Sequence, residues 1–309
     1  MNNYLPTFYM MMGISGSGKS SIADHIVRRE NSETVIHASD DIRAELGDVN
    51  DQTKNDLVFK ILHNRVKQDL SNGKNVIYDA TNLNKRRRIA FLRDLKNIPC
   101  KKVCVCVVKE YSKCIRDNSN RERSVPEDVI RRQLMHWQPP HKHEGFDEVQ
   151  VFVDKSRFHW KYNLFSLFEW LDSIDQDNIH HNSTVGVHCK KCATEIMKKF
   201  PEDNVLIFSA LLHDIGKPFV KTNVKPNGDI DENAHYYQHQ CVSAYQSMLY
   251  ESNIGADNML DIANIIYFHM HPHMSWKQSE RAKQRDINII GNEMYHAIER
   301  LHEADLAAH

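Results

Sequence analysis

Short apolar runs alternate with amphipathic stretches through the first half of the chain. The runs are short enough and apolar enough for buried strands, which are expected at residues 8–12, 35–39, 76–82, 103–108 and 146–153. The stretches between them have helical spacing or polar faces, and helices are expected at residues 20–29, 56–70, from 84 onward and at 127–136. This alternation predicts an α/β domain, a parallel sheet with flanking helices.

The second half has a different pattern, because its apolar residues recur at helical spacing. Helices are expected at residues 164–174, up to residue 200, at 205–212 and around 235–239. Residues 155–161 form a plausible junction. The pattern therefore predicts two domains, an α/β domain at residues 1–154 and an all-α domain at residues 155–309.

The composition is that of an ordinary globular protein, with 41% hydrophobic and 26% charged residues among 309. No apolar run approaches the ~20 residues that span a bilayer, so no membrane association is expected. The N-terminus lacks the features of a signal peptide, which makes the cytoplasm the expected compartment. The seven cysteines are unevenly spaced and do not form a disulfide framework; Cys189 and Cys192 lie in a helical pattern and are interpreted as packing residues.

The net charge of −1 hides an asymmetry between the halves. Residues 1–154 carry 25 Lys and Arg against 21 Asp and Glu, a net charge of +4, whereas residues 155–309 carry 15 against 20, a net charge of −5. Of the 19 histidines, 6 lie in the first part and 13 in the second. The first part can attract phosphates, and the second is rich in potential metal ligands.

A phosphate-binding loop follows the first expected strand. Residues 13–20 fit G-x-x-x-x-G-K-[ST], and a helical pattern begins directly after them. Lys19 is expected to reach the β- and γ-phosphates of ATP, and the Ser20 hydroxyl to bind Mg²⁺. The backbone and the helix N-terminus are expected to hold the phosphates through Gly13, Ser15, Gly16, Ser17 and Gly18.

Acidic residues follow the second and third expected strands, where an acceptor hydroxyl would lie. We interpret Asp40 as a general base and Asp41 as a helix cap or a partner of Mg²⁺-bound water. Arg43, one turn onward, is interpreted as binding a phosphate on the acceptor, with a surface arginine as the alternative. Asp79 ends the third strand, and the basic cluster at residues 85–88 opens the next helix.

Arginines occupy a polar segment after the fourth strand. Arg116, Arg121 and Arg123 precede Val125 and Pro126 and are candidates for a lid that neutralises charge on the transferred phosphoryl group.

In this order, the P-loop, Asp40-Asp41-x-Arg43, residues 79–84 with Arg87, and the arginine lid resemble the 5′-hydroxyl polynucleotide kinases, the phage type in particular. The resemblance covers about residues 7–154. It implies that Asp40 deprotonates a 5′-hydroxyl, that Arg43 holds the neighbouring 3′ phosphate and that a lid arginine contacts ATP. Substrate contacts are also expected from Asp79, Asn82 and Arg87, and an ATP contact from Arg116. The spacing of the lid arginines at residues 116–121 departs slightly from the spacing usual in the family. Arg121 and Arg123 therefore both remain candidates for the catalytic arginine.

A second set of motifs lies beyond residue 174. His213 and Asp214 end an apolar helix and are followed by Gly216, Lys217 and Pro218, and because neighbouring side chains do not share a helix face, the pair must bind at a helix end. His188, His213, Asp214 and Asp305 together resemble the signature of the HD phosphohydrolase superfamily. His239 and His269 match the additional ligands of its two-metal members. Residues 213–239 are similar to the HD domains attached to bacterial tRNA nucleotidyltransferases.

The ligand types define the expected chemistry of this second centre. Imidazoles and carboxylates suit Mn²⁺, Fe²⁺, Co²⁺, Ni²⁺ or Zn²⁺, and one or two such ions are expected. Lys217 is interpreted as holding a substrate phosphate, with simple exposure as the alternative, and His235 as a substrate contact or a spare ligand. The other histidines of the region are assigned no role: His271, His273, His296, His302 and His309.

Together the motifs predict a bifunctional enzyme that repairs RNA or DNA ends. It would phosphorylate 5′-hydroxyl ends with ATP and hydrolyse 2′,3′-cyclic phosphate or terminal 2′- or 3′-phosphate, with a ligase as downstream partner. A small-molecule or nucleotide kinase fused to an HD nucleotidase is one alternative. A non-catalytic nucleotide sensor is the other.

Overall fold

The chain forms two compact units in a computed structural model that describes residues 5–30, 32–47, 53–121, 123–154, 163–178 and 183–309. The first unit contains Met1–Ile130 and Lys142–Asp154, and the second contains Arg131–His141 and Lys155–His309. Residues 131–141, which the sequence pattern places in the first domain, thus group with the second unit. The junction expected at residues 155–161 lies outside the described residues.

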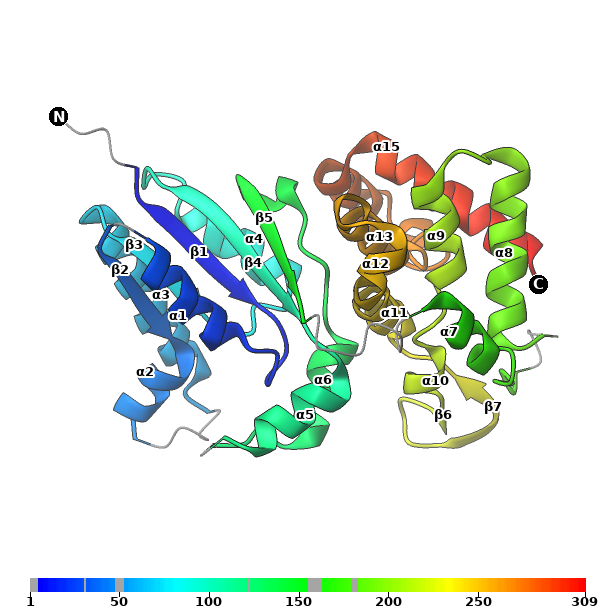
Figure 1. The fold of residues 1–309 in the computed structure, drawn as a ribbon, viewed down its shortest axis with the longest axis horizontal. Helices are drawn as coiled ribbons and strands as arrows, with labels where there is room; N and C mark the ends of the chain where they lie inside the picture. Colours follow the sequence, from blue (N-terminus) through cyan, green and yellow to red (C-terminus); the bar gives the residue numbers. More distant parts are fainter. Residues whose placement is uncertain (1–4, 31, 48–52, 122, 155–162, 179–182) are drawn as a thin grey trace. The chain divides into compact units, whose positions relative to one another are not determined.

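The first unit is built on a five-stranded parallel sheet in the order β2-β3-β1-β4-β5 (Figure 1). Its strands are β1 (Thr7–Met12), β2 (Thr34–Ala38), β3 (Asn75–Asp79), β4 (Lys101–Val108) and β5 (Glu148–Val153). Five of the six residues of β1 are buried, as a strand covered on both faces requires. The expected parallel sheet is therefore confirmed.

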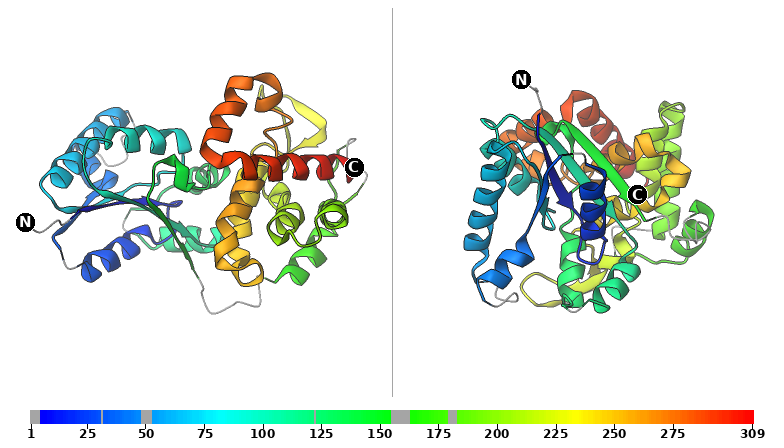
Figure 2. Two further views of the ribbon diagram at one scale, coloured as in Figure 1. Left: turned by 90° about the horizontal axis from the view of Figure 1, so that it is seen from above. Right: turned by 60° about the vertical axis from the view of Figure 1, so that its left-hand side comes forward.

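Helices cover both faces of this sheet (Figure 2). On one face, Ala23 and Ile26 of α1 (Lys19–Arg29) pack against Tyr9 and Met11 of β1. On the other face, Phe91 of α4 (Lys85–Asp94) packs edge-on against Phe8 and Tyr78. The remaining helices of this part of the chain are α2 (Ser39–Glu45), α3 (Asn55–Ser71), α5 (Tyr111–Ser119), α6 (Glu127–Met135) and the 3-10 turn η1 (Lys142–Glu144).

Part of the basic cluster at residues 85–88 is structural, which the sequence pattern did not indicate. The Arg88 side chain is buried and forms two 2.7 Å hydrogen bonds with the Glu144 carboxylate. Its remaining Nη1 donates to the carbonyl oxygens of Asn82 and Leu83 at 3.0 and 3.1 Å. Arg88 therefore ties α4 to η1 and to the loop after β3, and it does not face a substrate.

The second unit is mainly helical, as expected for an HD domain. Its helices are α7 (Leu164–Leu171), α8 (Val185–Lys199), α9 (Asn204–Leu212), α10 (Lys217–Val220), α11 (His239–Ser247), α12 (Glu251–Ile254), α13 (Ala256–Phe268), α14 (Ser275–Gln278) and α15 (Glu280–Ala307), with a 3-10 turn η3 (Met248–Tyr250). None of the described helices combines the length and the apolar character needed to span a bilayer.

One expected helix is wrong. Residues near 235 form an antiparallel hairpin of β6 (Thr222–Val224) and β7 (Ile230–His235), and α11 begins only at His239. Gly228, with φ +92°, lies in the connection between the two strands. His235 and His239 therefore do not share a helix face. The Pro226-Asn227-Gly228 sequence was the available turn signal.

Candidate active sites

The P-loop follows the central strand β1 and leads into α1. Gly16 has φ +79°, and a Cβ atom on it would lie 2.1 Å from the carbonyl oxygen of Cys114 in α5, so only glycine fits there. Gly18 has φ +95° and precedes the first helical residue, Lys19. The loop thus packs against α5 and presents the N-terminus of an eleven-residue helix to a phosphate.

Lys19, Ser20 and Asp79 form the centre of this first site. Lys19 Nζ donates to the Ile14 carbonyl oxygen at 3.0 Å, and Ser20 Oγ donates to Asp79 Oδ2 at 2.9 Å. Burial lowers the pKa of Lys19, and burial raises the pKa of Asp79 against the opposing charge of Lys19. The hydroxyl and carboxylate pair has the oxygen donors that Mg²⁺ takes beside a bound nucleotide, so the expected Mg²⁺ fits here.

Asp40 lies beside these groups, since its charge acts on the pKa values of both Lys19 and Asp79. Its Oδ1 accepts from Arg43 Nη1 at 2.9 Å and also lies 2.9 Å from Arg123 Nη1. Arg43 in turn donates to Asn55 Oδ1 at 2.7 Å. The residue before α2 is Ala38, without a side-chain cap, so the interpretation of Asp41 as a helix cap is wrong.

The other residues expected to contact the substrate or ATP, namely Asn82, Arg87 and Arg116, make contacts within the protein. Asn82 turns its amide toward the protein, donating to the Met11 carbonyl oxygen at 2.7 Å. Arg87 is exposed on α4, and its backbone N–H is capped by Asn84 Oδ1 at 3.0 Å. Arg116 is exposed on α5, where its Nε lies 3.4 Å from Asp117. The bond from Asn82 holds the loop after β3 against β1, and the substrate contact expected of Asn82 stays a prediction.

The segment that carries the lid arginines is held by a pair of hydrogen bonds that the sequence pattern did not indicate. The Asn118 side chain is buried, donates to the Val125 carbonyl oxygen at 2.8 Å and accepts from the Val125 N–H at 3.0 Å. These two bonds close the loop that carries Arg121 and Arg123.

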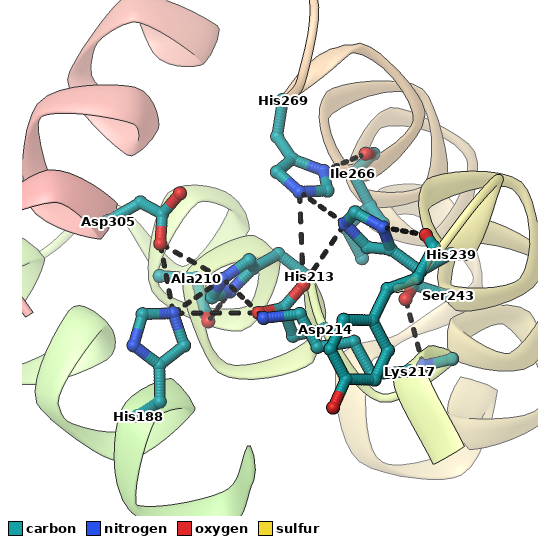
Figure 3. Close-up of polar contacts among 12 residues, drawn as sticks. His188, Ala210, His213, Asp214, Lys217, His239, Ser243, Ile266, His269 and Asp305 are labelled. Atoms are coloured by element: carbon teal, nitrogen blue, oxygen red, sulfur yellow. Dashed lines mark hydrogen bonds and ion pairs between the residues drawn. The ribbon is translucent and has the colours of Figure 1, made fainter. Parts of the chain in front are cut away.

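In the second unit, four side chains from α8, α15 and the turn after α9 converge on one point (Figure 3). His188 Nε2 of α8 lies 2.9 Å from Asp305 Oδ1 of α15 and 3.3 Å from His213 Nε2, at the end of α9. Asp214 Oδ2 completes the group at 3.5 Å from His188 Nε2 and 3.3 Å from His213 Nε2. Two imidazole nitrogens and two carboxylate oxygens thus form a compact donor set suited to a transition metal.

A second donor set shares Asp214 with the first. Its other oxygen, Oδ1, lies 3.2 Å from His239 Nε2 and 4.0 Å from His269 Nε2, and the two imidazole nitrogens are 3.2 Å apart. One carboxylate therefore faces both sets, one oxygen to each. Asp214 would therefore be shared by the two donor sets if each held an ion.

The histidines are oriented as metal ligands. The Nδ1 atoms of His213, His239 and His269 lie 2.7, 2.8 and 2.6 Å from the carbonyl oxygens of Ala210, Tyr236 and Ile266. A carbonyl oxygen can only accept, so each Nδ1 carries a proton, and the neutral rings of His239 and His269 direct their Nε2 lone pairs inward. Lone pairs that face one another across 3.2 Å repel unless a cation lies between them. The residues therefore fit metal ions on this structural ground.

The ionisation states agree with this fit. Burial opposes the charge of Asp214, but His213 and Lys217 outweigh it and keep the pKa of that carboxyl well below its usual range. Burial lowers the pKa of His269 to about 3 and also lowers that of His239, so both rings are neutral. Burial opposes the charge of His213 too, but Asp214 raises its pKa well above the ordinary value. A positive charge is thus favoured at this point, and a metal ion would replace the proton.

Gly216 allows the two donor sets to approach each other. A Cβ on Gly216 would lie 2.6 Å from the Ser243 backbone nitrogen and 2.8 Å from the His239 carbonyl oxygen. The Gly216 N–H also donates to Ser243 Oγ at 2.9 Å. The turn that carries Asp214 is therefore packed directly against the α11 backbone that carries His239.

Lys217 lies directly beside the donor sets. Its Nζ is 2.7 Å from Asp214 Oδ2 and donates to Gln176 Oε1 at 2.7 Å, and it stands 5.3 Å from the ring centre of Tyr236. Lys217 is buried, so the interpretation of a simply exposed lysine is wrong. Gln176 and Tyr236 could not be recognised as its partners from the sequence pattern.

Two further histidines differ in their placement. His235 stacks on Tyr237, with ring centres 5.3 Å apart, and its Nε2 faces Asp231 at 3.2 Å, outside the metal-binding groups formed by the described residues. His309, which was assigned no role, lies with its ring 5.0 Å from that of His188 and its Nε2 3.9 Å from Asp305 Oδ1. Its spacing of four from Asp305 on α15 was the signal for this proximity.

Comparison with protein families assigns both units. Residues 8–140 match the AAA domain family, and residues 179–302 match the HD domain family. The chain carries an AAA domain followed by an HD domain. The P-loop, with Asp40 and Asp79, lies in the AAA domain, and all six residues of the two donor sets lie in or directly after the matched part of the HD domain. No curated protein sequence matches the chain.

Several solved structures are similar to parts of the chain. A chain of the Pnkp1/Rnl/Hen1 RNA repair complex is 22% identical over 44% of this chain, with a TM-score of 0.37. A gluconokinase from Sinorhizobium meliloti is 15% identical over 50% of this chain and 86% of its own, with a TM-score of 0.36. A sugar kinase from Janibacter sp. is 18% identical over 48% and 85%, also with a TM-score of 0.36. The match spans only 45% of the RNA repair chain.

Proposed function

We propose that this protein heals broken nucleic-acid ends through two reactions. The AAA domain transfers the γ-phosphate of ATP to a 5′-hydroxyl end. The HD domain hydrolyses a 2′,3′-cyclic phosphate or a terminal 2′- or 3′-phosphate. Nucleases that leave 5′-hydroxyl and cyclic phosphate ends produce both substrates in one cut, and a ligase is the natural downstream partner.

The position of Asp40 carries the kinase proposal. It stands beside Lys19 and Asp79 at the phosphate site, and Arg43 and Arg123 hold its Oδ1 at 2.9 Å. A carboxylate there can accept the proton of an attacking hydroxyl, and the adjacent guanidinium of Arg43 can bind a phosphate of the same acceptor. A polynucleotide end is an acceptor that carries both groups.

The remaining groups position the donor. The Lys19 ammonium, which contacts the Ile14 carbonyl oxygen at 3.0 Å, is placed to move onto a phosphate oxygen of ATP. Ser20 and Asp79 would hold Mg²⁺, which when bound neutralises charge on the β- and γ-phosphates. Arg121 adds a further positive charge near Lys19 and Asp79.

The shared carboxylate of Asp214 supports the phosphohydrolase proposal. His188, His213, Asp214 and Asp305 would hold one ion, and Asp214, His239 and His269 a second. When bound, the ions would supply a hydroxide nucleophile and stabilise the charge that develops on a phosphoester. Lys217 is placed to hold a phosphate oxygen while it remains bonded to Gln176.

The kinase half is tested by transfer of ³²P from ATP to 5′-hydroxyl oligonucleotides. We expect transfer with the wild type and its loss in Asp40→Asn, whereas Asp24→Asn, which changes an exposed carboxylate of α1, should retain it. No transfer to any oligonucleotide, with efficient transfer to a small molecule, would favour the small-molecule kinase instead.

The phosphohydrolase half is tested by incubation of RNA with 2′,3′-cyclic or 3′-phosphate ends in the presence of each candidate metal. Opening of the cyclic phosphate to a monoester, or release of phosphate from the 3′-phosphate end, should require a metal and disappear in Asp214→Asn, while Asp257→Asn on the surface of α13 should behave as the wild type. Hydrolysis of free nucleotides alone would identify a nucleotidase.

A further inference from the structure

Two arginines converge on the same oxygen atom of Asp40. Arg43 Nη1 and Arg123 Nη1 each lie 2.9 Å from Asp40 Oδ1. Two guanidinium groups thus meet at one carboxylate oxygen, in a place where the Asp40 side chain is half exposed. Guanidinium groups bind phosphate oxygens well, so a phosphate that approaches this carboxylate can contact both arginines.

Arg43 also has unused binding capacity. It is only 9% exposed and is held by Asn55 at 2.7 Å, yet its buried Nε has no hydrogen-bond partner among the described residues. A buried charged N–H without an acceptor is costly, and the oxygen of an incoming anion would satisfy it. The observation points to an anionic ligand beside Asp40.

Arg121 lies near a different pair of groups, Lys19 and Asp79. Burial lowers the pKa of Lys19, and the charge of Arg121 lowers it further; Arg121 also opposes the burial that raises the pKa of Asp79. The two lid arginines therefore face different partners. Arg121 is next to the ATP-binding groups, and Arg123 is next to the general base.

Resting on the proposed kinase function, we infer that Arg123 belongs to the acceptor side of the site. There it joins Arg43 in binding the phosphate on the 3′ side of the nucleoside that is phosphorylated. Arg121 remains as the lid arginine for ATP.

This assignment explains why the two arginines hold Asp40 in the free protein. When the acceptor phosphate binds, it competes for both guanidinium groups and releases Asp40 Oδ1. Asp40 Oδ1 can then accept the proton of the 5′-hydroxyl. At the same time the 5′-oxygen forms its bond to the γ-phosphorus, and the bond between that phosphorus and the ADP oxygen breaks. Preference for a strand end over a nucleoside follows from the same contacts.

The test is steady-state kinetics with three acceptors, namely a nucleoside, the nucleoside 3′-monophosphate and a 5′-hydroxyl oligonucleotide. Arg123→Ala should raise the KM for the two phosphate-bearing acceptors about tenfold or more, as loss of a charged hydrogen bond does. The KM for ATP should stay at the wild-type level, the loss with the nucleoside should be smaller than with either phosphate-bearing acceptor, and Arg123→Lys should recover part of the loss. Calorimetry should show a matching loss of affinity for the nucleoside 3′-monophosphate alone.

Arg121→Ala is the matched variant, and it should raise the KM for ATP instead. A raised KM for ATP in Arg123→Ala, or an equal loss of kcat with nucleoside and nucleoside 3′-monophosphate, would overturn the assignment. The second result would mean that Arg123 only holds Asp40 in position. Absence of transfer by the wild type to every acceptor would instead overturn the kinase proposal, and this assignment with it.

Discussion

At the scale of single residues, both proposed reactions depend on carboxylates with several simultaneous contacts. Asp214 faces His188 and His213 with Oδ2 and His239 with Oδ1. Asp40 is held by two arginines through one oxygen. The sequence predicted each as a functional residue from its motif. It could not indicate a shared oxygen or a bridging role, because both require partners from distant elements.

The charge of Lys19 leads to a pH dependence. Burial lowers the pKa of Lys19 below its ordinary 10.5. A lysine is cationic only below its pKa, so the group that binds the ATP phosphates loses its charge at a lower pH than a free lysine. We expect kcat/KM for ATP to fall with rising pH at values below 10.5. The pH profile of kcat/KM is the measurement, since it reports the free enzyme.

A variant with a permanent charge is the control for this profile. Lys19→Arg should have a lower rate but no alkaline decline, because a guanidinium stays protonated throughout the range. A wild-type profile that stays flat up to pH 10.5 would contradict the assignment of the decline to Lys19.

The contact at Gly216 leads to a prediction about metal content. In Gly216→Ala the new methyl would lie 2.6 Å from the Ser243 backbone nitrogen, so α11 and His239 must move away from Asp214. We expect the variant to lose the ion held by His239 and His269 and to retain the other. Mass spectrometric metal analysis should therefore give about half of the wild-type content.

Ser243→Ala is the comparison for that variant, because it removes the hydrogen bond to the Gly216 N–H without adding volume. Its metal content should stay at the wild-type level. Equal metal content in Gly216→Ala and the wild type would show that the close approach is not needed.

At the scale of elements, the sequence predicted the parallel strands and the P-loop helix well, because apolar runs of strand length and a glycine-rich loop are local signals. It failed at β6 and β7, whose exposed residues such as Ile230 and Val224 lack an alternating apolar face. It also failed at Arg88, since a buried arginine cannot be told from its exposed neighbours without Glu144. Long-range partners decide such cases.

The pair of Arg88 and Glu144 should stabilise the first unit. Glu144→Ala leaves the Arg88 guanidinium buried without its carboxylate, and we expect the free energy of unfolding to fall by about 3–5 kcal/mol. Arg86→Ala, on the exposed side of the same helix, should change it by less than about 0.5 kcal/mol. Urea unfolding followed by hydrogen exchange of the β1 and β3 amides measures the difference.

Replacing both Arg88 and Glu144 by apolar residues should cost much less stability than removing Glu144 alone. Arg88→Met with Glu144→Leu should recover most of the lost stability, because no unpaired charge remains buried. A double variant as unstable as Glu144→Ala would contradict this account of the pair.

At the scale of the whole chain, one short segment joins the second unit before the first unit is complete. Residues 131–141 group with the second unit, where Trp137 is fully buried against Tyr245 at 5.3 Å between ring centres. Asn264 Nδ2 donates to the Pro140 carbonyl oxygen at 3.1 Å. The chain then returns to the first unit with Glu144 and β5. A cut at residue 154 would therefore remove a core side chain from the second unit.

Trp137→Ala should destabilise the HD domain by about 3–5 kcal/mol, as loss of a buried large aromatic does. Phosphohydrolase activity should be lost at a lower temperature, while kinase activity should persist. Trp170→Ala, which changes a half-exposed tryptophan of α7, should have a smaller effect. Residual activities after heating measure both, and equal losses in the two variants would contradict the placement of Trp137.

The most direct test of the central claim uses one RNA with a 5′-hydroxyl and a 2′,3′-cyclic phosphate, incubated with ATP, Mg²⁺ and a transition metal. The wild type should convert both ends and make the RNA a substrate for a ligase. Asp40→Asn should convert only the cyclic phosphate, and Asp214→Asn only the 5′-hydroxyl. Failure of the wild type to change either end, or loss of both reactions in either variant, would contradict the account.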